Sequence, residues 1–431
     1  MSLPTAARRA PGPRGLELLR AANDFRRSPL PTLERLTRQH GDVVSVALPG
    51  RQAFLFAHPD QVRHILIRRG DNYLKTGGTR AARRFFGDSM QLKNGDRAKA
   101  MRRLLAPLFA FDRVAAAYGD LIVEETQALI RDWSPGPRPG LTREIMDLLL
   151  HIMVGVHFGT RGEDTRRVGA LYAKAFALLP SSTLPEWIAT PRNRRYAAAV
   201  AELDAVILER LAAARRHDGG DTDLAAAFLR IGLSEMQARH ELVAMMAAAY
   251  GTVGMALVQT LRLLGEHPGI DAEIAAEVSV APSPVPDVRQ LNYTGKVLKE
   301  SLRLCPPAGL VMRRCAEDDV VEGWAVPAGA RIVLSSWVVQ RDPRYYEEPL
   351  AFRPERWTPG FESALPPGAY FPFGAGHRSC IGSVLSNVTL RLAIATIVTR
   401  FRLESPITPP DRTAWPLLLA DGGLRATLHA R

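Results

Sequence analysis

The chain has 431 residues, of which 46% are hydrophobic and 23% charged, and these proportions exclude disordered, collagen-like and coiled-coil proteins. Its 56 basic and 44 acidic residues give a net charge of +12, but the basic residues are spread along the chain without a nucleic-acid-binding motif, so we expect no nucleic-acid partner. The three cysteines include no CxxC pair, which excludes a disulfide framework and predicts a reducing, cytoplasmic setting.

The amino-terminal part is predicted to hold a helix and a β-hairpin. Residues 1–15 contain no apolar segment of a signal peptide, so we expect a soluble protein without a membrane anchor. Residues 31–40 are amphipathic, and β-type runs follow at 43–48 and 53–57. The Pro-Gly-Arg-Gln sequence between these runs is typical of a hairpin turn.

From about residue 59 to residue 265 the hydrophobic pattern is mostly helical. Residues 242–261 contain no charge, and a run of this length must be considered as a membrane span. The run includes Gly251, Thr252 and Gln259 and stands alone, so we favour a helix buried in the core of a soluble protein.

The last third of the chain combines a helix, short strands and a long irregular segment. A helix is predicted at 295–304, where a Pro-Pro pair ends it. Strands are predicted at 320–326 and 332–337, with a Pro-Ala-Gly turn between them. Residues 341–382 are rich in proline, glycine and aromatic residues, and a helix resumes at 383–399. Since no repeat or linker divides the chain, one domain spanning 1–431 is expected.

The irregular segment ends in the sequence FPFGAGHRSCIG at 371–382. Gly374, Gly376 and Gly382 allow backbone conformations closed to other residues, so that peptide N–H groups can converge on the Cys380 sulfur and stabilise a thiolate. The helix that follows adds its positive end. Such a thiolate is suited to be the axial ligand of haem iron, although a lone cysteine in a glycine-rich turn is more often a buried structural residue.

The spacing of this segment favours the ligand interpretation. The pattern F-G-x-G-x-R-x-C-x-G fixes six positions in ten residues, and its chance occurrence in this chain is on the order of 10⁻⁵. The segment resembles the cysteine loop of the cytochrome P450 family. The resemblance implies that Cys380 is the ligand of the haem iron and that Phe373, Gly374, Arg378 and Gly382 also contact the haem.

Two further segments resemble the same family in the same order. Glu300 and Arg303 match its E-x-x-R helix motif, and a Cys-Pro-Pro sequence follows at 305–307. The sequence Pro-Glu-Arg-Trp at 354–357 resembles the family's P-E-R-F segment. An i, i+3 pair shares one helix face, where Arg356 could join it in a charge-assisted network. The resemblance implies a structural role for this cluster.

Three arginines stand at positions that the family uses to bind the haem propionates: Arg102 in a helix predicted at 97–107, Arg313 just before the strand expected after the Pro-Pro pair, and Arg378 two residues before the cysteine. Guanidinium groups match carboxylates in geometry. Ala98 departs from the family pattern, because a Trp or His commonly binds a propionate from that place.

The uncharged run carries the residues that resemble the distal side of the family's site. Thr252 matches the threonine that delivers protons during dioxygen activation. Gly251 stands where a carboxylate normally accompanies that threonine, so the usual acid and alcohol pair is incomplete. Gln340 replaces the usual histidine before an Arg-Asp-Pro sequence.

The resemblance as a whole implies a mainly α prism with small β-sheets, in which haem b lies between a long distal helix and the cysteine loop. It implies a monooxygenase that uses O₂ to oxidise an apolar small molecule, such as a terpenoid or polyketide of secondary metabolism. Electrons are expected from a ferredoxin and a ferredoxin reductase, with NAD(P)H as the ultimate donor. An acidic partner could dock near Arg97, Lys99 and Arg103.

Two other functions stay open. Gly251 is compatible with a peroxide-driven or non-oxygenating haem-thiolate enzyme, and a non-catalytic auxiliary protein of the same fold is a third possibility, disfavoured by the intact cysteine loop. The substrate pocket is expected within 79–92 and 173–195. An apolar lining is expected there from Leu178, Leu179, Leu184 and Trp187, although core packing explains these residues equally well.

Overall fold

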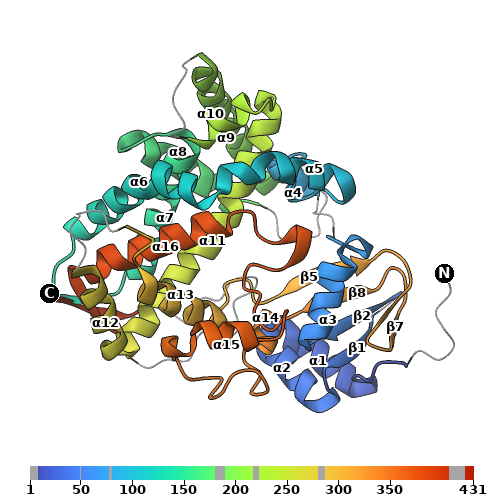
Figure 1. The fold of residues 1–431 in the computed structure, drawn as a ribbon. Coiled ribbons are helices and arrows are strands. Elements are labelled where there is room, and N and C mark those ends of the chain that lie inside the picture. The colour runs from blue at the N-terminus through green and yellow to red at the C-terminus, as the bar shows by residue number, and fades with distance from the viewer. Residues whose placement is uncertain are drawn as a thin grey trace.

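The computed structural model describes residues 8–48, 50–76, 80–179, 190–216, 223–279, 287–406 and 423–431. Helices form most of the molecule, and the largest sheet lies at one side, next to the first three helices (Figure 1). This confirms the predicted mainly α class with small β-sheets.

The α-helices of the described residues are α1 (Gly15–Arg27), α2 (Pro29–His40), α3 (Pro59–Arg63), α4 (Arg80–Phe86), α5 (Gly95–Leu105), α6 (Phe111–Arg131), α7 (Leu141–Phe158), α8 (Glu163–Ala177), α9 (Pro191–Arg216), α10 (Leu224–Arg230), α11 (Glu235–Glu266), α12 (Pro268–Ser279), α13 (Asn292–Leu304), α14 (Ser336–Val339), α15 (Pro359–Ala364) and α16 (Ser383–Val398). A π-helical turn, η1 (His64–Arg68), and the 3₁₀ turns η2 (Gly70–Asn72), η3 (Ala106–Phe109), η4 (Pro354–Arg356) and η5 (Gly376–Arg378) connect them.

The strands are β1 (Val43–Leu48), β2 (Arg51–Phe56), β3 (Tyr73–Leu74), β4 (Gly136–Arg138), β5 (Val311–Cys315), β6 (Asp319–Val321), β7 (Trp324–Val326), β8 (Arg331–Leu334), β9 (Phe401–Glu404) and β10 (Ala426–Ala430). The main sheet has the order β1-β2-β8-β5-β3. Strand β8 runs parallel to β2, and the other neighbours in this sheet are antiparallel. In the pairing of β3 with β5, Leu74 lies opposite Arg314. Residue 75, directly after β3, is therefore close to residue 313, although the two are far apart in sequence.

Helix α11 crosses the helical part of the fold. A capping box begins it, because the Ser234 hydroxyl accepts from the Gln237 backbone N–H and the Gln237 side chain accepts from the Ser234 N–H. Gly254 allows α7 to approach closely, since a Cβ at this position would lie 2.4 Å from the Met146 sulfur. Within the described chain, α11 alone is long and apolar enough to cross a membrane, yet 67% of its most apolar window is buried inside the fold.

The structure corrects two sequence predictions in the sheet region. Residues 320–326 do not form one strand but the hairpin of β6 and β7, because Glu322 and Gly323 adopt positive φ angles of 46° and 84° and reverse the chain. The strand predicted at 332–337 ends at Leu334, and its last residues belong to α14, which Ser335 caps by accepting from the Val338 N–H. The predicted Pro-Ala-Gly turn is followed by β8, which pairs with β2 and β5 and not with the 320–326 segment.

Candidate active site

The cysteine loop is held in a tight turn in front of α16. Gly374 and Gly376 have φ angles of 69° and 70°, which side chains rarely adopt. A Cβ on Gly376 would also lie 2.0 Å from the Leu66 carbonyl oxygen, so only glycine fits there. The Cys380 N–H donates to the Phe373 carbonyl at 2.8 Å and closes the loop.

The structure corrects the expectation for the third glycine of this loop. Gly382 has an ordinary φ of −84° as the residue before α16, so its backbone conformation does not require glycine. Its contribution is the backbone N–H, which is directed at the cysteine. Burial raises the pKa of the Cys380 thiol, whereas the Gly382 N–H and the positive charge of Arg102 lower it.

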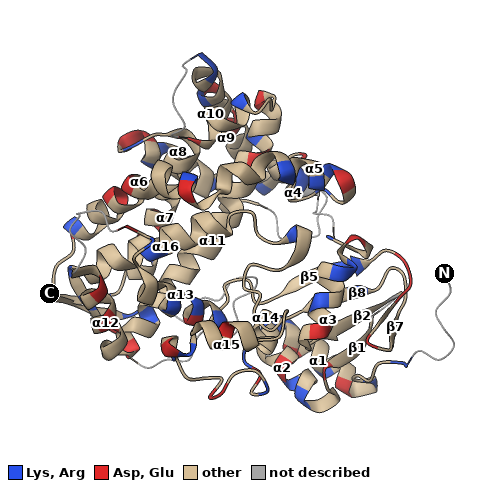
Figure 2. Ribbon diagram, viewed as in Figure 1, with Lys and Arg blue, Asp and Glu red and all other residues tan. Residues whose placement is uncertain are grey.

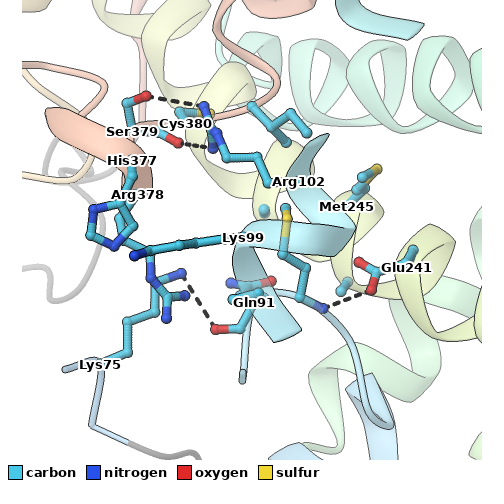
Figure 3. A pocket seen from close by; sticks show the side chains of 15 residues that line it. Lys75, Gln91, Lys99, Arg102, Glu241, Met245, His377, Arg378, Ser379 and Cys380 are labelled. Atoms are coloured by element: carbon cyan, nitrogen blue, oxygen red, sulfur yellow. Dashed lines mark hydrogen bonds between the residues drawn. The ribbon is translucent and has the colours of Figure 1, made fainter. Parts of the chain in front are cut away.

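Two adjoining cavities lie between α11 and the cysteine loop. The first, of about 210 Å³, is lined by residues of α5, α11 and the loop (Figure 3). The second, of about 90 Å³, extends between α7, α11 and α16 and is mostly apolar. The residues lining both cavities are Met245, Ala248, Cys380 and Ile381. The exposed side chain of Cys380 therefore faces a slot, with α11 on the opposite wall.

Positively charged side chains from four separate segments converge at one end of this slot. Arg102 of α5 donates to the carbonyl oxygen and the hydroxyl of Ser379, at 2.6 and 3.1 Å. Arg378 donates to the Asn94 side chain at 2.9 Å. Arg313, which lies within β5, is 8% exposed and donates to a backbone carbonyl. Lys75, directly after β3, donates to the Gln91 carbonyl at 3.3 Å (Figure 3).

In the described part of the chain, none of these four cations forms an ion pair, and Arg378 interacts with Asp71 only at longer range. Burial, with the charges of Arg313 and Arg378, lowers the pKa of Lys75 to about 8. Burial and Arg378 likewise lower the pKa of Arg313 to about 10. Because the like charges destabilise one another, this end of the slot is suited to bind a ligand with two negative groups.

Thr252 lies on the α11 wall of the second cavity, which Cys380 also lines. Its hydroxyl donates to the Ala248 carbonyl at 2.5 Å, so the oxygen keeps its capacity to accept a proton donor from the cavity. The neighbouring Gly251 is buried and provides no acid.

Comparisons with known proteins agree with this geometry. The family model described as "Cytochrome P450" matches residues 10–425. The chain belongs to the cytochrome P450 family. It is 32% identical to cyclooctat-9-en-7-ol 5-monooxygenase of Streptomyces melanosporofaciens, over 88% of this chain and 86% of that protein. It is 28% identical to pentalenene oxygenase of Streptomyces avermitilis, over 91% and 90% of the two chains. The protein is thus an oxidoreductase of the P450 monooxygenase type.

Solved P450 structures share the fold. The haem domain of cytochrome P450DA superposes with a TM-score of 0.86 at 22% identity, covering 99% of this chain and 98% of the other. Retinoic-acid-bound cyanobacterial CYP120A1 gives a TM-score of 0.83 at 20% identity, covering 99% and 100%. The predicted P450-like prism is confirmed.

The P450 family implies a haem cofactor, and the residues of the slot fit that group. The uncompensated cations match two propionates, the slot separates α11 from the cysteine loop, and Cys380 presents a thiol to it. Of the predicted site residues, the structure brings Arg102, Arg378 and Cys380 to the first cavity, and Thr252 and Gly382 to the second. Arg313, Phe373 and Gly374 adjoin these residues but do not line either cavity.

The predicted Glu-Arg-Arg cluster of this P450 is confirmed. Glu300 and Arg303 are fully buried. Arg303 donates from Nε and Nη2 to the two carboxylate oxygens of Glu300, at 2.9 and 2.8 Å, and Arg356 donates to the same carboxylate at 2.9 Å. The Trp357 indole N–H donates to the same carboxylate at 2.9 Å. With its charge shared between two guanidinium groups and an indole, Glu300 is a satisfied buried anion and not a catalytic one.

Gln340, which departs from the family pattern, has a defined structural role. Its buried side-chain amide donates to the carbonyls of Leu302 and Arg303, at 3.0 and 3.1 Å. Its oxygen accepts from the Phe371 N–H at 2.9 Å. The residue thereby joins the end of α13 to the beginning of the cysteine loop.

Sequence reasoning missed two charged residues that line the first cavity, Lys75 and Glu241. No motif surrounds Lys75, and its position is determined by the pairing of β3 with β5. Of the predicted substrate segments, 79–92 contributes cavity residues at 90 and 91. In the other, Leu178 and Leu179 pack against the helical core, and Leu184 and Trp187 lie outside the described residues.

Proposed function

We propose that this P450 is a cytoplasmic haem b monooxygenase that hydroxylates a terpenoid, with O₂ as oxidant and electrons from a ferredoxin and its NAD(P)H-dependent reductase. The proposal rests on four cations without ion pairs at one end of a slot, and on Cys380, which lines the same slot. The terpenoid class is supported by the relatives, since cyclooctat-9-en-7-ol 5-monooxygenase and pentalenene oxygenase are named for terpenoid substrates.

In this proposal each residue of the slot has a separate task. Cys380 binds the iron as a thiolate, and Arg102, Arg313 and Arg378 hold the propionates together with Lys75. When bound, the haem supplies the chemistry of dioxygen activation and oxygen transfer to carbon. Thr252 passes protons from the cavity through its hydroxyl, and the apolar cavity wall positions the substrate and excludes water.

A ferredoxin would dock beside the cysteine loop, on the exposed surface of α5. Arg102 of this helix contacts Ser379, the residue next to Cys380. Arg97 and Arg103 of the same helix are exposed, and Figure 2 shows basic residues along α5. Lys99 is less available, since it pairs with Asp71 at 2.7 Å. An acidic protein surface complements these charges.

The test of the cofactor assignment uses the haem-loaded protein. We expect the reduced protein with carbon monoxide to show the strongly red-shifted Soret band of thiolate ligation, and Cys380→Ser to lose it. Cys315→Ala is the matched control, because Cys315 is buried in β5 away from both cavities. Retention of the band in Cys380→Ser would refute the assignment.

One observation favours a second candidate function, a peroxide-driven enzyme: the cavity has no carboxylate at position 251 to complete the proton relay. Turnover with hydrogen peroxide, but none with a surrogate ferredoxin and reductase, would select this candidate. A purified protein that takes up haem but binds no terpenoid and turns over with neither oxidant would indicate an auxiliary protein.

A further inference from the structure

A buried carboxylate lies on the wall of the first cavity, apart from the residues that the proposed mechanism uses. Glu241 belongs to the beginning of α11, is only 2% exposed and lines the cavity with Met245 and Ala248. Figure 3 places it next to Met245, across the pocket from Lys75. The cavity is thus apolar on this wall except for one acid.

The hydrogen-bonding capacity of this carboxylate is only partly used. Its Oε1 accepts from the Met90 backbone N–H at 2.7 Å. Among the residues that the structure describes, no cation lies within ion-pair distance and no donor contacts Oε2. A carboxylate can accept several hydrogen bonds, and burying one without partners is costly. Burial accordingly raises the pKa of Glu241 to about 7, although the Met90 N–H and Lys93 oppose the change.

The surroundings indicate which donor would complete this site. The apolar residues of the cavity suit a hydrocarbon skeleton. Burying an ammonium group among these apolar residues costs more than burying a neutral donor. A neutral hydroxyl on an otherwise apolar molecule satisfies both conditions, since it donates to Oε2 without carrying charge.

The position of Glu241 along α11 determines where such a molecule would be oxidised. Glu241, Met245, Ala248 and Thr252 follow one another at helical spacing on one face. Seven residues separate Glu241 from Ala248, or roughly 10 Å along the helix axis at 1.5 Å per residue. A sesquiterpenoid or diterpenoid whose hydroxyl lies at Glu241 would therefore present a remote carbon near Ala248 and Thr252.

We infer that Glu241 is a specificity-determining residue that binds a hydroxyl group already present on the substrate, so that the enzyme oxidises a terpenoid alcohol in preference to the corresponding hydrocarbon. This inference rests on the proposed terpenoid monooxygenase function. The reaction that supplies the substrate must then be one that leaves a hydroxyl on the skeleton, such as a cyclisation that ends in capture of water.

The test compares matched pairs of terpenes that differ only in a hydroxyl group, for example drimenol and drimene, in a panel of monocyclic to tricyclic skeletons. Binding to the haem-loaded protein is measured by the substrate-induced change of the Soret band and by calorimetry. The informative quantity is the ratio of the dissociation constants of the alcohol and the hydrocarbon. A substitution of Glu241 can displace the segment at Met90, but this displacement weakens the binding of both ligands alike and leaves their ratio unchanged. Glu241→Met removes the acceptor at similar volume, and Glu241→Gln keeps an acceptor for Met90.

Above pH 8, where Glu241 with its pKa of about 7 is mostly ionised, we expect the wild type to prefer the alcohol by about tenfold, as for a hydrogen bond to a charged acceptor. Glu241→Met should abolish this preference and Glu241→Gln should reduce it. Glu235→Gln, outside the cavity on the same helix, is the control and should retain it. An equal affinity for both ligands in the wild type, or a preference that survives in Glu241→Gln and Glu241→Met, overturns the inference. If no pair binds at all, the terpenoid substrate class itself is refuted.

Discussion

Arg102 of α5 donates to both the carbonyl oxygen and the hydroxyl of Ser379, the residue directly before Cys380. The guanidinium group therefore fixes the cysteine loop to α5 and at the same time places a positive charge at the cavity. Ala98, one turn earlier on the same helix, contributes no polar group, and Lys99 is paired with Asp71, so we assign the main interaction of α5 with an anionic ligand to Arg102.

Replacing Arg102 should weaken haem retention. A charge-assisted hydrogen bond contributes roughly 1.5–3 kcal/mol, so Arg102→Ala is expected to accelerate haem transfer to apomyoglobin by at least about tenfold. Ser379→Ala removes one hydrogen bond of the pair but leaves the charge, and its effect should be small. Arg103→Ala, at the exposed neighbouring position, serves as control. Equal rates for Arg102→Ala and Arg103→Ala would contradict the assigned role.

The Glu300 cluster should contribute to stability and not to catalysis. Arg356→Ala leaves a buried carboxylate without one of its cations, which is expected to lower the free energy of unfolding by about 3 kcal/mol. Arg353→Ala is the matched control, since Arg353 is half-exposed and pairs only with Glu347 and Glu348 through its side chain. Thermal unfolding followed by circular dichroism measures both. A midpoint for Arg356→Ala that coincides with that of Arg353→Ala would show that the cluster is not needed.

Thr252 should control how well electron consumption is coupled to product. Assistance by a general acid or base is worth roughly 10²–10⁴-fold in rate, so Thr252→Ala is expected to divert most NAD(P)H to hydrogen peroxide. Gly251→Asp should improve coupling by restoring the missing carboxylate, and more so with a substrate that lacks a hydroxyl. Val253→Ala, which alters the same cavity without touching a hydroxyl, is the control. Full coupling in Thr252→Ala would rule out the relay.

The pH dependence of stability should carry a signature of Glu241. Its pKa is about 7 in the folded protein against 4.5 for an ordinary glutamate, so the folded state binds more protons between these values and loses stability as the pH rises. Glu241→Gln stays neutral throughout. We expect its stability to equal that of the wild type near pH 4.5 and to exceed it by about 3 kcal/mol above pH 7.

The measurement compares thermal midpoints of the two haem-loaded proteins from pH 5 to pH 8.5, with Glu235→Gln as the control for loss of a carboxylate on the same helix. A difference between Glu241→Gln and the wild type that does not grow with pH would mean that Glu241 is not held in an unfavourable environment.

Local patterns in the sequence were sufficient for the mostly helical character of residues 59–265 and for the cysteine loop, although they did not delimit most of the individual helices. The loop could be predicted because its glycines and cysteine act within ten residues, whereas the hairpin at 319–326 was read as one strand because β-type composition conceals the Glu-Gly turn. Strands β4 and β10 were not predicted, because β4 is only three residues long and pairs across almost 300 positions of the chain.

The cavity was harder to predict than the loop. Glu241 directly precedes the uncharged run of residues 242–261, so by its sequence position it is indistinguishable from an exposed acid at the polar end of a helix. Lys75 reaches the cavity only because β3 pairs with β5. No local sequence pattern predicts this pairing. Charges that act through tertiary neighbours have no signature in a single sequence.

The amide of Gln340 also determines how the cysteine loop responds to acidity. A histidine in the same place would change its charge between roughly pH 5 and pH 8 and would have to exchange donors for acceptors as it did so. Gln340 instead satisfies two carbonyls and one N–H with a group that never titrates. The hydrogen bonds that Gln340 makes between α13 and the thiol-bearing loop therefore need no change of protonation at any pH.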